Sequence, residues 1–421
     1  MPDQSEPSTI VSHSSAMPNH IPDAHFESRA FLARHVDDTL RFYEQHAFDP
    51  AGGFFHYLKD DGTVYNRGHR HLVSATRHVF NWSMAHRHTG RTPYLAWARH
   101  ALNHVQQGFR VPEGQAGGGL YAWTLQDGVA QDRRIMAYGQ AFALLAHSHA
   151  HQVGLASAAE IAAVFDRMGE VFYESAHQAY ADELSADGVL SPYRGQNANM
   201  HMCEACLAAF EATGDARYLD RAEQLIERFA FTHAAQTQNL VWEHYGEDWR
   251  ADWSYNQDHP GDIFKPWGFQ TGHQTEWAKL LLLAAEHRPQ RRWIDRAAQL
   301  QLAAYQHGWD ARHGGLIYGF APDHSPCDTD KYFWVQAESF ASAWRLWRVT
   351  GEPVFRQQYA DTWAWSWQHL VDHQYGAWFR VLSADASKLE DTKSPAGKVD
   401  YHTMGACWDV MAAGGLADEA G

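Results

Sequence analysis

The feature that most constrains the fold is a repeat of short segments in which glycine adjoins apolar residues. Six segments share this pattern, spaced 58 to 70 residues apart: Gly53, Gly118, Gly188, Gly246, Gly315 and Gly376. A second series falls between them, near Gly90, Gly154, Gly214, Arg288 and Gly351. Glycine suits the left-handed position that ends many helices. Each unit is therefore predicted to hold a buried helix, a tight turn, an amphipathic helix and a longer loop with a small hairpin. The fourth copy matches this pattern least well.

Hydrophobic periodicity separates two kinds of helix. One kind has a single apolar face and is predicted at 94–107, 157–173, 218–229, 291–305 and 355–369. The other kind is apolar nearly all round and is predicted at 138–146, 204–212, 275–285 and 334–347. Repeats above 60 residues are longer than those of most open solenoids, which favours closure into a ring. The sequence predicts an all-α (α/α)6 barrel with six inner and six outer helices, forming one catalytic domain over 26–421.

Composition and charge limit the partners of the chain. The 421 residues include 34 Lys and Arg against 50 Asp and Glu, a formal charge of −16, which disfavours nucleic acid and anionic membranes. Residues 1–25 are polar and rich in Ser and Pro, so they are predicted to be a disordered tail and not a signal peptide. With only four cysteines and no long apolar run, we expect a soluble, cytoplasmic protein. The 18 Trp, 18 Tyr and 21 Phe either fill the core or stack on sugar rings.

Two predicted inner helices begin with a histidine followed three residues later by a glutamate. His201 and Glu204 form one pair, and His273 and Glu276 form the other, each just after a loop rich in Gly, Asn or Pro. Residues three apart share one helix face, and a buried carboxylate is costly unless it is paired. We expect each histidine to contact the glutamate of its own helix and to have a raised pKa. A single such pair is often only a solvated surface pair, but two copies at corresponding positions favour a functional role.

Further polar residues lie near the starts of other predicted inner helices. His402 precedes the last apolar segment, Arg77 lies in the first, Tyr138 in the second and Trp334 in the fifth. In a closed ring these starts meet at one rim, where they would surround a central pocket. Other roles stay open for three of them: His402 as a core or capping histidine, Arg77 as an ion-pair partner of Glu204 or Glu338, and Trp334 as core packing.

Metal and nucleotide cofactors are not predicted. Two His and two Glu could bind a metal, but carboxylate-bridged bundles order the motif as Glu-x-x-His, opposite to this chain. Cys203 and Cys206 form a CxxC pair without a second Cys or His pair nearby, which disfavours a zinc site. No glycine-rich phosphate-binding motif joins a strand to a helix.

Four segments resemble the signature segments of the N-acylglucosamine 2-epimerase superfamily. They are NANMHMCE at 197–204, KPWGFQTGHQTEWAKLL at 265–281, KYFWVQAE at 331–338 and KVDYHTM at 398–404. The resemblance extends from about Phe31 to Met411. Within the superfamily the chain looks most like bacterial mannose isomerases and related aldose–ketose isomerases, and less like cellobiose or mannose 2-epimerases.

The resemblance implies a barrel that acts on an unmodified sugar without metal or cofactor. It implies that His273 and His402 are the catalytic acid and base. It implies that seven other residues hold the substrate or tune the histidines: Arg77, Tyr138, Asn197, His201, Glu204, Glu276 and Trp334. Relatives often carry Arg where this chain has Lys265, whose role is therefore open.

The expected reaction interconverts D-mannose and D-fructose through a cis-enediol, with histidine moving the proton. The same two histidines would serve a 2-epimerase acting on mannose or glucose, cellobiose or an N-acyl hexosamine. Two other classes remain as alternatives: a glycoside hydrolase or lyase with paired carboxylates, and a non-catalytic binding solenoid. The expected partner is a small neutral monosaccharide, and the protein is expected to be a monomer or homodimer.

Overall fold

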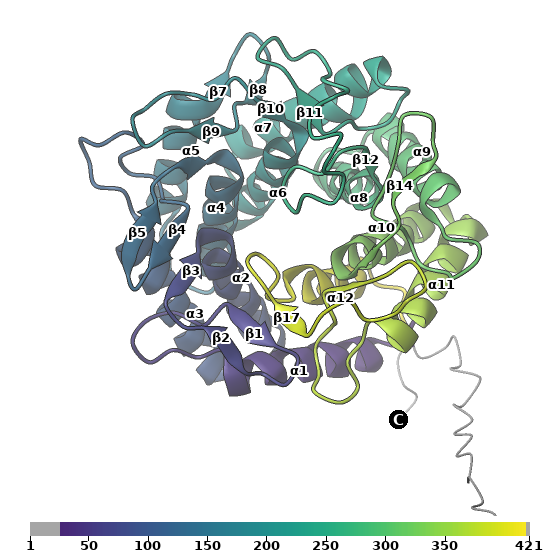
Figure 1. The fold of residues 1–421 in the computed structure, drawn as a ribbon, viewed down its shortest axis with the longest axis horizontal. Helices are drawn as coiled ribbons and strands as arrows, with labels where there is room; N and C mark the ends of the chain where they lie inside the picture. Colours follow the sequence, from purple (N-terminus) through teal and green to yellow (C-terminus); the bar gives the residue numbers. More distant parts are fainter. Residues whose placement is uncertain (1–25, 418–421) are drawn as a thin grey trace, which may run out of the picture.

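The computed structural model describes residues 26–417, so the predicted tail at residues 1–25 lies outside the described part of the chain. Residues 26–417 contain twelve α-helices, which confirms that the fold is mostly helical. Figure 1 shows them in two concentric rings. The inner helices are α2 (Leu72–Thr89), α4 (Ala137–Gln152), α6 (Gln196–Thr213), α8 (Thr271–His287), α10 (Phe333–Thr350) and α12 (Tyr401–Ala413). The outer helices are α1 (Arg29–His46), α3 (Thr92–His104), α5 (Ala158–Phe172), α7 (Ala216–Ile226), α9 (Arg291–Gly308) and α11 (Pro353–His369).

Contacts between helices close the inner ring. Each inner helix packs against the next one along the chain, and α12 packs against α2, which joins the last unit to the first. Each inner helix also contacts an outer one, and the N-terminal helix α1 takes the place outside α12. The ring therefore closes from both ends of the chain, as Figure 1 shows where the first and last colours meet.

The turns between inner and outer helices follow the predicted glycine pattern. Gly90, Gly214 and Gly351 cap α2, α6 and α10 in the left-handed conformation, with φ of 68°, 72° and 73°. The turn after α8 instead has Arg288 with φ of −130°. This departure lies in the unit whose sequence pattern is weakest.

Short antiparallel strands hold the starts of the inner helices in register. Five strands each end at the residue before an inner helix: β3 (His69–His71), β6 (Ile135–Met136), β10 (Arg194–Gly195), β12 (Phe269–Gln270) and β15 (Lys331–Tyr332). Their antiparallel partners belong to the loop of the following unit: β4 (Thr124–Gln126), β9 (Glu183–Leu184), β11 (His244–Tyr245), β13 (Gly319–Phe320) and β16 (Val381–Leu382). Because the partner strand fixes where each helix begins, the first turns of the inner helices meet at one rim.

The other strands complete small sheets around that rim. They are β1 (Tyr57–Lys59), β2 (Val64–Asn66), β5 (Val129–Asp132), β7 (Tyr173–Glu174), β8 (Ala179–Tyr180), β14 (Pro326–Asp328) and β17 (Thr392–Ser394). Strand β1 pairs with both β2 and β17, which links the last loop to the first. Many aromatic side chains fill the space between the rings, and Trp82, Trp277, Trp344 and Trp363 are fully buried there. Within residues 26–417, no helix has the length and apolar character needed to cross a membrane.

Candidate active site

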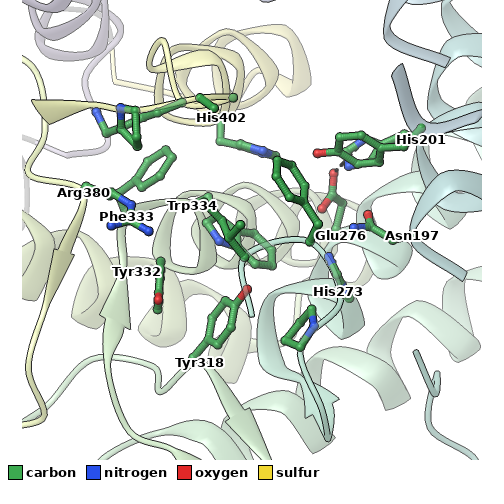
Figure 2. A pocket seen from close by; sticks show the side chains of 18 of the residues that line it. Asn197, His201, His273, Glu276, Tyr318, Tyr332, Phe333, Trp334, Arg380 and His402 are labelled. Carbon is green, nitrogen blue, oxygen red and sulfur yellow. Dashed lines mark ion pairs between the residues drawn. The ribbon is translucent and has the colours of Figure 1, made fainter. Parts of the chain in front are cut away.

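One pocket lies where the inner helices begin, and Figure 2 shows its lining side chains. Eight of the nine predicted site residues line it: Arg77, Tyr138, Asn197, His201, His273, Glu276, Trp334 and His402. The ninth, Glu204, lies one turn deeper on α6 and contacts His201 from below. The structure therefore brings together side chains from all six inner helices, as the repeat pattern predicts.

His402 is held in one tautomer by two neighbours. Its Nδ1 lies 2.7 Å from Oε1 of Glu338, and its Nε2 lies 3.1 Å from a terminal nitrogen of Arg77. Arginine can only donate, so Nε2 must accept, and the ring proton must lie on Nδ1, where it is donated to Glu338. Burial and the Arg77 charge hold the pKa of His402 well below its usual value. His402 is thus a neutral imidazole whose Nε2 lone pair faces the pocket.

His273 does not contact Glu276, contrary to the expectation from their spacing. Its Nδ1 instead donates to Oε1 of Glu243 at 2.8 Å. The amide nitrogen of Gln196 donates to the other oxygen of Glu243 at 2.9 Å, and the orientation of that amide is fixed because Trp277 Nε1 donates to its oxygen at 2.7 Å. The Gln196 amide nitrogen also lies 2.9 Å from Nδ1, but the Glu243 carboxylate can only accept, so the ring proton lies on Nδ1 and Nε2 of His273 is the nitrogen available to the pocket.

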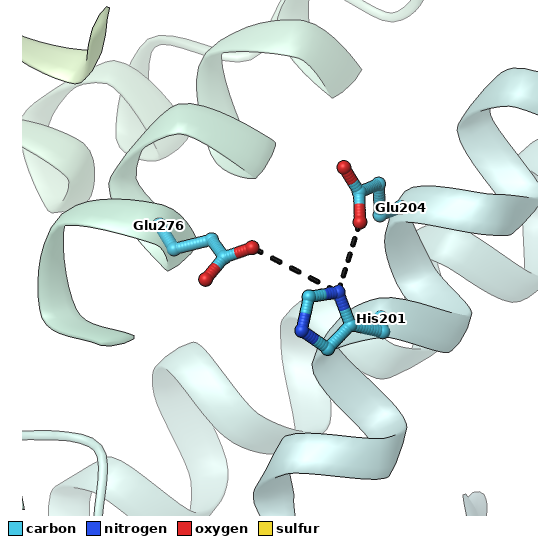
Figure 3. A group of neighbouring side chains, drawn as sticks. All are labelled: His201, Glu204 and Glu276. Atoms are coloured by element: carbon cyan, nitrogen blue, oxygen red, sulfur yellow. Dashed lines mark hydrogen bonds and ion pairs between the residues drawn. The ribbon is translucent and has the colours of Figure 1, made fainter. Parts of the chain in front are cut away.

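His201 does contact the glutamate of its own helix, as predicted. Its Nδ1 lies 2.9 Å from Glu204 Oε2 and 3.8 Å from Glu276 Oε1, as Figure 3 shows. The expected rise in pKa is wrong, however, because burial lowers the pKa of His201 by more than the Glu204 charge raises it. The pKa of Glu204 falls well below its usual range, since it accepts hydrogen bonds from both His201 and Tyr401.

Glu276 is buried without a hydrogen-bond partner for either carboxylate oxygen among the described residues. Its burial, together with the nearby charge of Glu338, raises its pKa well above the usual value. Asn197 Oδ1 likewise has no hydrogen-bond partner within residues 26–417. Buried polar atoms without partners are uncommon in proteins. In a pocket lined by donors and acceptors, these atoms are suited to bind hydroxyl groups of a ligand.

Arg77 does not form the ion pair with Glu204 or Glu338 that the sequence left open. Its guanidinium donates to the carbonyl of Gly397, lies 3.4 Å from the Tyr138 hydroxyl and approaches His402. Its guanidinium carbon packs against two aromatic rings, 4.3 Å from the Phe142 centroid and 4.6 Å from that of Tyr401. Cation–π contacts therefore hold this cation beside the pocket, where one of its donors contacts His402.

Trp334 lies between the two candidate catalytic histidines. Its ring centroid is 5.0 Å from that of His273 and 5.8 Å from that of His402. A methyl group on Gly272 would overlap the Trp334 ring, so the glycine in the first turn of α8 allows this close approach. Trp334 therefore forms a wall of the pocket and does more than fill the core.

The backbone before His402 is strained. Val399 and Asp400 adopt φ of 43° and 44°, which is rare for residues other than glycine and especially for a β-branched valine. Side chains from α1 and α2 hold these two residues in this conformation. Asn81 donates to the carbonyl of Val399 at 2.7 Å, and the Tyr43 hydroxyl donates to Asp400 at 2.6 Å. Such strain persists where the surroundings enforce it, often at functional sites. Here it fixes the start of α12.

The sequence interpretation missed two carboxylates that contact the histidines and two cations that line the pocket. Glu243 had no detectable signal, because it lies in a loop and reaches His273 only through the fold. Glu338 lies within a segment that resembles the family, four residues after Trp334, but its contact with His402 crosses between helices. Arg380 and Lys398 also line the pocket. Burial lowers the pKa of Lys398 to about 8, although its ammonium donates to Asp400.

Lys265, whose role was open, is not among the lining residues although its neighbours Phe264 and Pro266 are. Its ammonium lies 4.1 Å from the ring centroid of Tyr193. A cation–π contact of this kind stabilises the loop before β12. It does not need the two parallel hydrogen bonds that an arginine can donate. A lysine therefore suffices at this position.

Two groups of side chains have potential metal-ligand atoms within 4.8 Å of one another: His201, Glu204 and Glu276, and Glu276, Glu338 and His402. In both groups the histidine Nδ1 already donates to a carboxylate. The ammonium of Lys279 lies 2.5 Å from Glu338 and supplies the positive charge that a cation would bring. We assign no metal ligand here, and independence from metal stays a prediction.

Comparison with known proteins defines the class to which the chain belongs. The family model described as N-acylglucosamine 2-epimerase matches residues 53–406. The chain belongs to the N-acylglucosamine 2-epimerase family.

Within that family, a D-mannose isomerase from Marinomonas mediterranea is 47% identical over 389 residues, which cover 92% of this chain and 98% of that protein. A cellobiose 2-epimerase from Bacteroides fragilis is 26% identical over 381 residues, covering 86% of this chain and 92% of that protein. A crystal structure of a D-mannose isomerase is similar with a TM-score of 0.89 and 46% identity, covering 92% of this chain and 98% of the other.

Proposed function

We propose that this protein is an aldose–ketose isomerase that interconverts D-mannose and D-fructose in an (α/α)6 barrel. The observation that carries the proposal is the state of His402, a neutral base whose Nε2 faces the pocket and whose Nδ1 proton is held by a carboxylate. Similarity to D-mannose isomerases over nearly the whole chain supports the choice of sugar. The proposed reaction requires neither metal nor cofactor.

The first half of the reaction forms the enediol. After the sugar ring opens, the carbonyl oxygen O1 takes the donors of Arg77 and Tyr138, which frees Nε2 of His402. Nε2 then removes the proton from C2, the electron pair forms the C1=C2 bond, and the negative charge develops on O1. Oriented donors stabilise such a charge, and Glu338 stabilises the imidazolium that His402 becomes.

The second half completes the isomerisation. Nε2 of His273 takes the proton from the O2 hydroxyl and passes it to O1, and the C2=O2 bond forms as the C1=C2 electron pair moves to C1. His402 returns its proton to C1 and becomes neutral again. The aldose is thereby converted to the ketose with no net change in protons. Glu276 and Asn197, whose side-chain oxygens have no hydrogen-bond partner among the described residues, bind the remaining sugar hydroxyls.

A 2-epimerase is the alternative function, and the geometry of His273 supports it. His273 has its own carboxylate on Nδ1 and lies against the same tryptophan as His402. If His273 returned a proton to the opposite face of C2, the product would be the epimeric aldose. The candidate substrates are then mannose or glucose, cellobiose or an N-acyl hexosamine.

The glycoside hydrolase alternative is weakened by the lining of the pocket. Retaining and inverting hydrolases use two carboxyl groups that flank the bond to be cleaved. Among the described residues that line this pocket, Glu276 is the single carboxylate. Glu243 and Glu338 lie behind the histidines and hold their Nδ1 protons.

The test is NMR of D-mannose incubated in D2O with EDTA-treated protein. We expect fructose to appear, with deuterium at C1 wherever the histidine proton exchanges before it returns. Glucose labelled at C2 would establish the 2-epimerase. Unchanged mannose would refute the proposed substrate, and a reaction that stops after EDTA and resumes with added metal would refute the metal-free mechanism.

A further inference from the structure

A second cavity lies below the proposed active site, at the other end of the inner ring. Residues from the middle and later turns of the inner helices line most of it, together with Tyr401 at the start of α12, whereas residues near the starts of the inner helices contribute to the sugar pocket. Glu204 and Glu338 border this lower cavity, while the histidines they contact border the upper one. The lower cavity also contains Lys279, which the proposed mechanism does not use.

Lys279 is connected to the base through one carboxylate. Its Nζ lies 2.5 Å from Glu338 Oε2, and the other oxygen of Glu338 accepts from His402 Nδ1 at 2.7 Å. On its far side, Nζ lies 3.6 Å from Asp409, which accepts from Arg345 at 3.0 Å. Lys279 is only 4% exposed. A lysine is rarely buried so fully unless its charge is needed by its partners.

The surroundings of Glu338 explain why a cation is needed. The titratable groups facing it come from three inner helices: His201 and Glu204 on α6, Glu276 and Lys279 on α8, and Tyr401 and His402 on α12. Two of these six are carboxylic acids. Carboxylates gathered in a low-dielectric interior disfavour one another's ionised forms. In this group Lys279 is the residue whose ammonium directly contacts Glu338.

We propose that Lys279 is a positioning residue for the isomerisation, which keeps Glu338 ionised so that Glu338 can hold the Nδ1 proton of His402. The inference rests on the proposed function in taking His402 as the base. An ionised Glu338 accepts from Nδ1, which keeps the Nε2 lone pair toward the sugar. A protonated Glu338 would donate to Nδ1 instead, and the ring proton would move to Nε2, where it would block proton abstraction.

The electrostatics fit this role. Burial raises the pKa of Glu338 above its usual value, and the Lys279 charge limits that rise. The carboxylates around Lys279 in turn raise its own pKa, so its ammonium stays charged. Lys279 also acts on His402 directly and lowers the pKa of the imidazole. Its two effects on His402 oppose each other, so the informative quantity is the pH at which Glu338 loses its proton.

The first experiment compares Lys279→Met and Lys279→Arg with the unmodified protein by the pH dependence of kcat/KM for mannose. Loss of a contacting charge shifts a carboxyl pKa by about 1–3 units. We expect the acid limb of Lys279→Met to move up by at least about one pH unit, with activity recovering at higher pH. Lys279→Arg keeps the charge, so its acid limb should stay in place. An unmoved acid limb in Lys279→Met would show that the lysine serves stability alone.

The lower cavity permits a second experiment. In Lys279→Ala the truncated side chain leaves space beside Glu338 that opens to this cavity and not to the sugar pocket. Ethylammonium at neutral pH should restore activity at least about tenfold, whereas tetramethylammonium, which has no N–H donors, should not. Equal effects of the two salts, or no effect of either, would contradict the need for an ammonium at this position.

A third readout does not depend on turnover. Proton–nitrogen NMR of the histidine rings, with the His402 signal assigned by its loss in His402→Ala, reports the tautomer. In Lys279→Met the proton should move from Nδ1 to Nε2 as the pH falls through the raised pKa of Glu338. If the unmodified protein converts no sugar, the proposed function fails, and this tautomer change still decides the role of Lys279. If Lys279→Met does not fold, the comparison uses Lys279→Ala with and without ethylammonium.

Discussion

Glu243→Gln is the sharpest test of the site, because the sequence offered no indication of this residue. In the structure, two donors converge on the Glu243 carboxylate: His273 Nδ1 at 2.8 Å and the Gln196 amide at 2.9 Å. The two donors contact different oxygens of Glu243, and a glutamine keeps only one of these oxygens, so in this geometry it accepts from only one donor. If it accepts from Gln196, its own amide faces Nδ1 as a donor, and the ring proton of His273 must move to Nε2.

The size of the effect follows from the bond that is lost. A hydrogen bond to a charged group contributes about 1.5–3 kcal/mol, and each 1.4 kcal/mol corresponds to about a tenfold change in rate. Since the bond strengthens as His273 becomes positively charged, the loss falls on the transition state. We therefore expect kcat/KM for mannose to fall roughly 10- to 150-fold, with little change in the folding of the protein.

The assay is the initial rate of fructose formation in four proteins: the unmodified enzyme, Glu243→Gln, His273→Ala and the double variant. Because Glu243 acts through His273, its substitution should cost less than about threefold in the His273→Ala background. Glu247→Gln, an exposed acid on the same loop, is the matched control and should be neutral. A normal rate for Glu243→Gln, or fully additive losses in the double variant, would refute this account of His273.

Three further predictions concern the base, the pocket wall and stability. His273→Ala and His402→Ala should each lower turnover at least about 100-fold, and near-normal rates in either variant would remove that histidine from the mechanism. Gly272→Ala places a methyl group against the Trp334 ring, so it should lower kcat/KM at least about tenfold with the unfolding temperature reduced by a few degrees; unchanged kinetics would show that Trp334 can move freely. Four buried histidines have pKa values lowered to about 3: His71, His78, His149 and His233. The unfolded chain binds protons at these histidines near pH 6.5 that the folded protein excludes, so stability is intact above that pH and is lost as the pH falls below it. Calorimetry should show the midpoint falling by at least about 5 °C between pH 7 and pH 5.5, and a constant midpoint would contradict the burial of neutral histidines.

Local patterns in the sequence predicted nine of the twelve helices of residues 26–417 by range, but not α1, which takes the outer position beside α12. Apolar periodicity distinguished inner from outer helices, and glycine at Gly90, Gly214 and Gly351 marked where the inner ones end. These signals are local, because helix faces and helix caps depend on residues a few positions apart. The same periodicity placed His201, His273 and His402 at the starts of inner helices, and the structure brings all three to one pocket.

The partners of those histidines were not predictable in the same way. Spacing suggested that His273 contacts Glu276, but the contact is with Glu243, 30 residues away. His402 contacts Glu338, 64 residues away, and its other nitrogen meets Arg77 from the opposite end of the chain. A shared helix face makes a contact possible but does not select it when a carboxylate from another unit is better placed.

The protonation states were decided by the tertiary structure alone. A neighbouring carboxylate suggested raised histidine pKa values, yet burial lowers those of His201 and His402. The sequence determined which chemical groups are present and that each begins an inner helix. Closure of the ring determined how deeply each group is buried and which charge it faces, and desolvation and Coulomb energies depend on those two quantities.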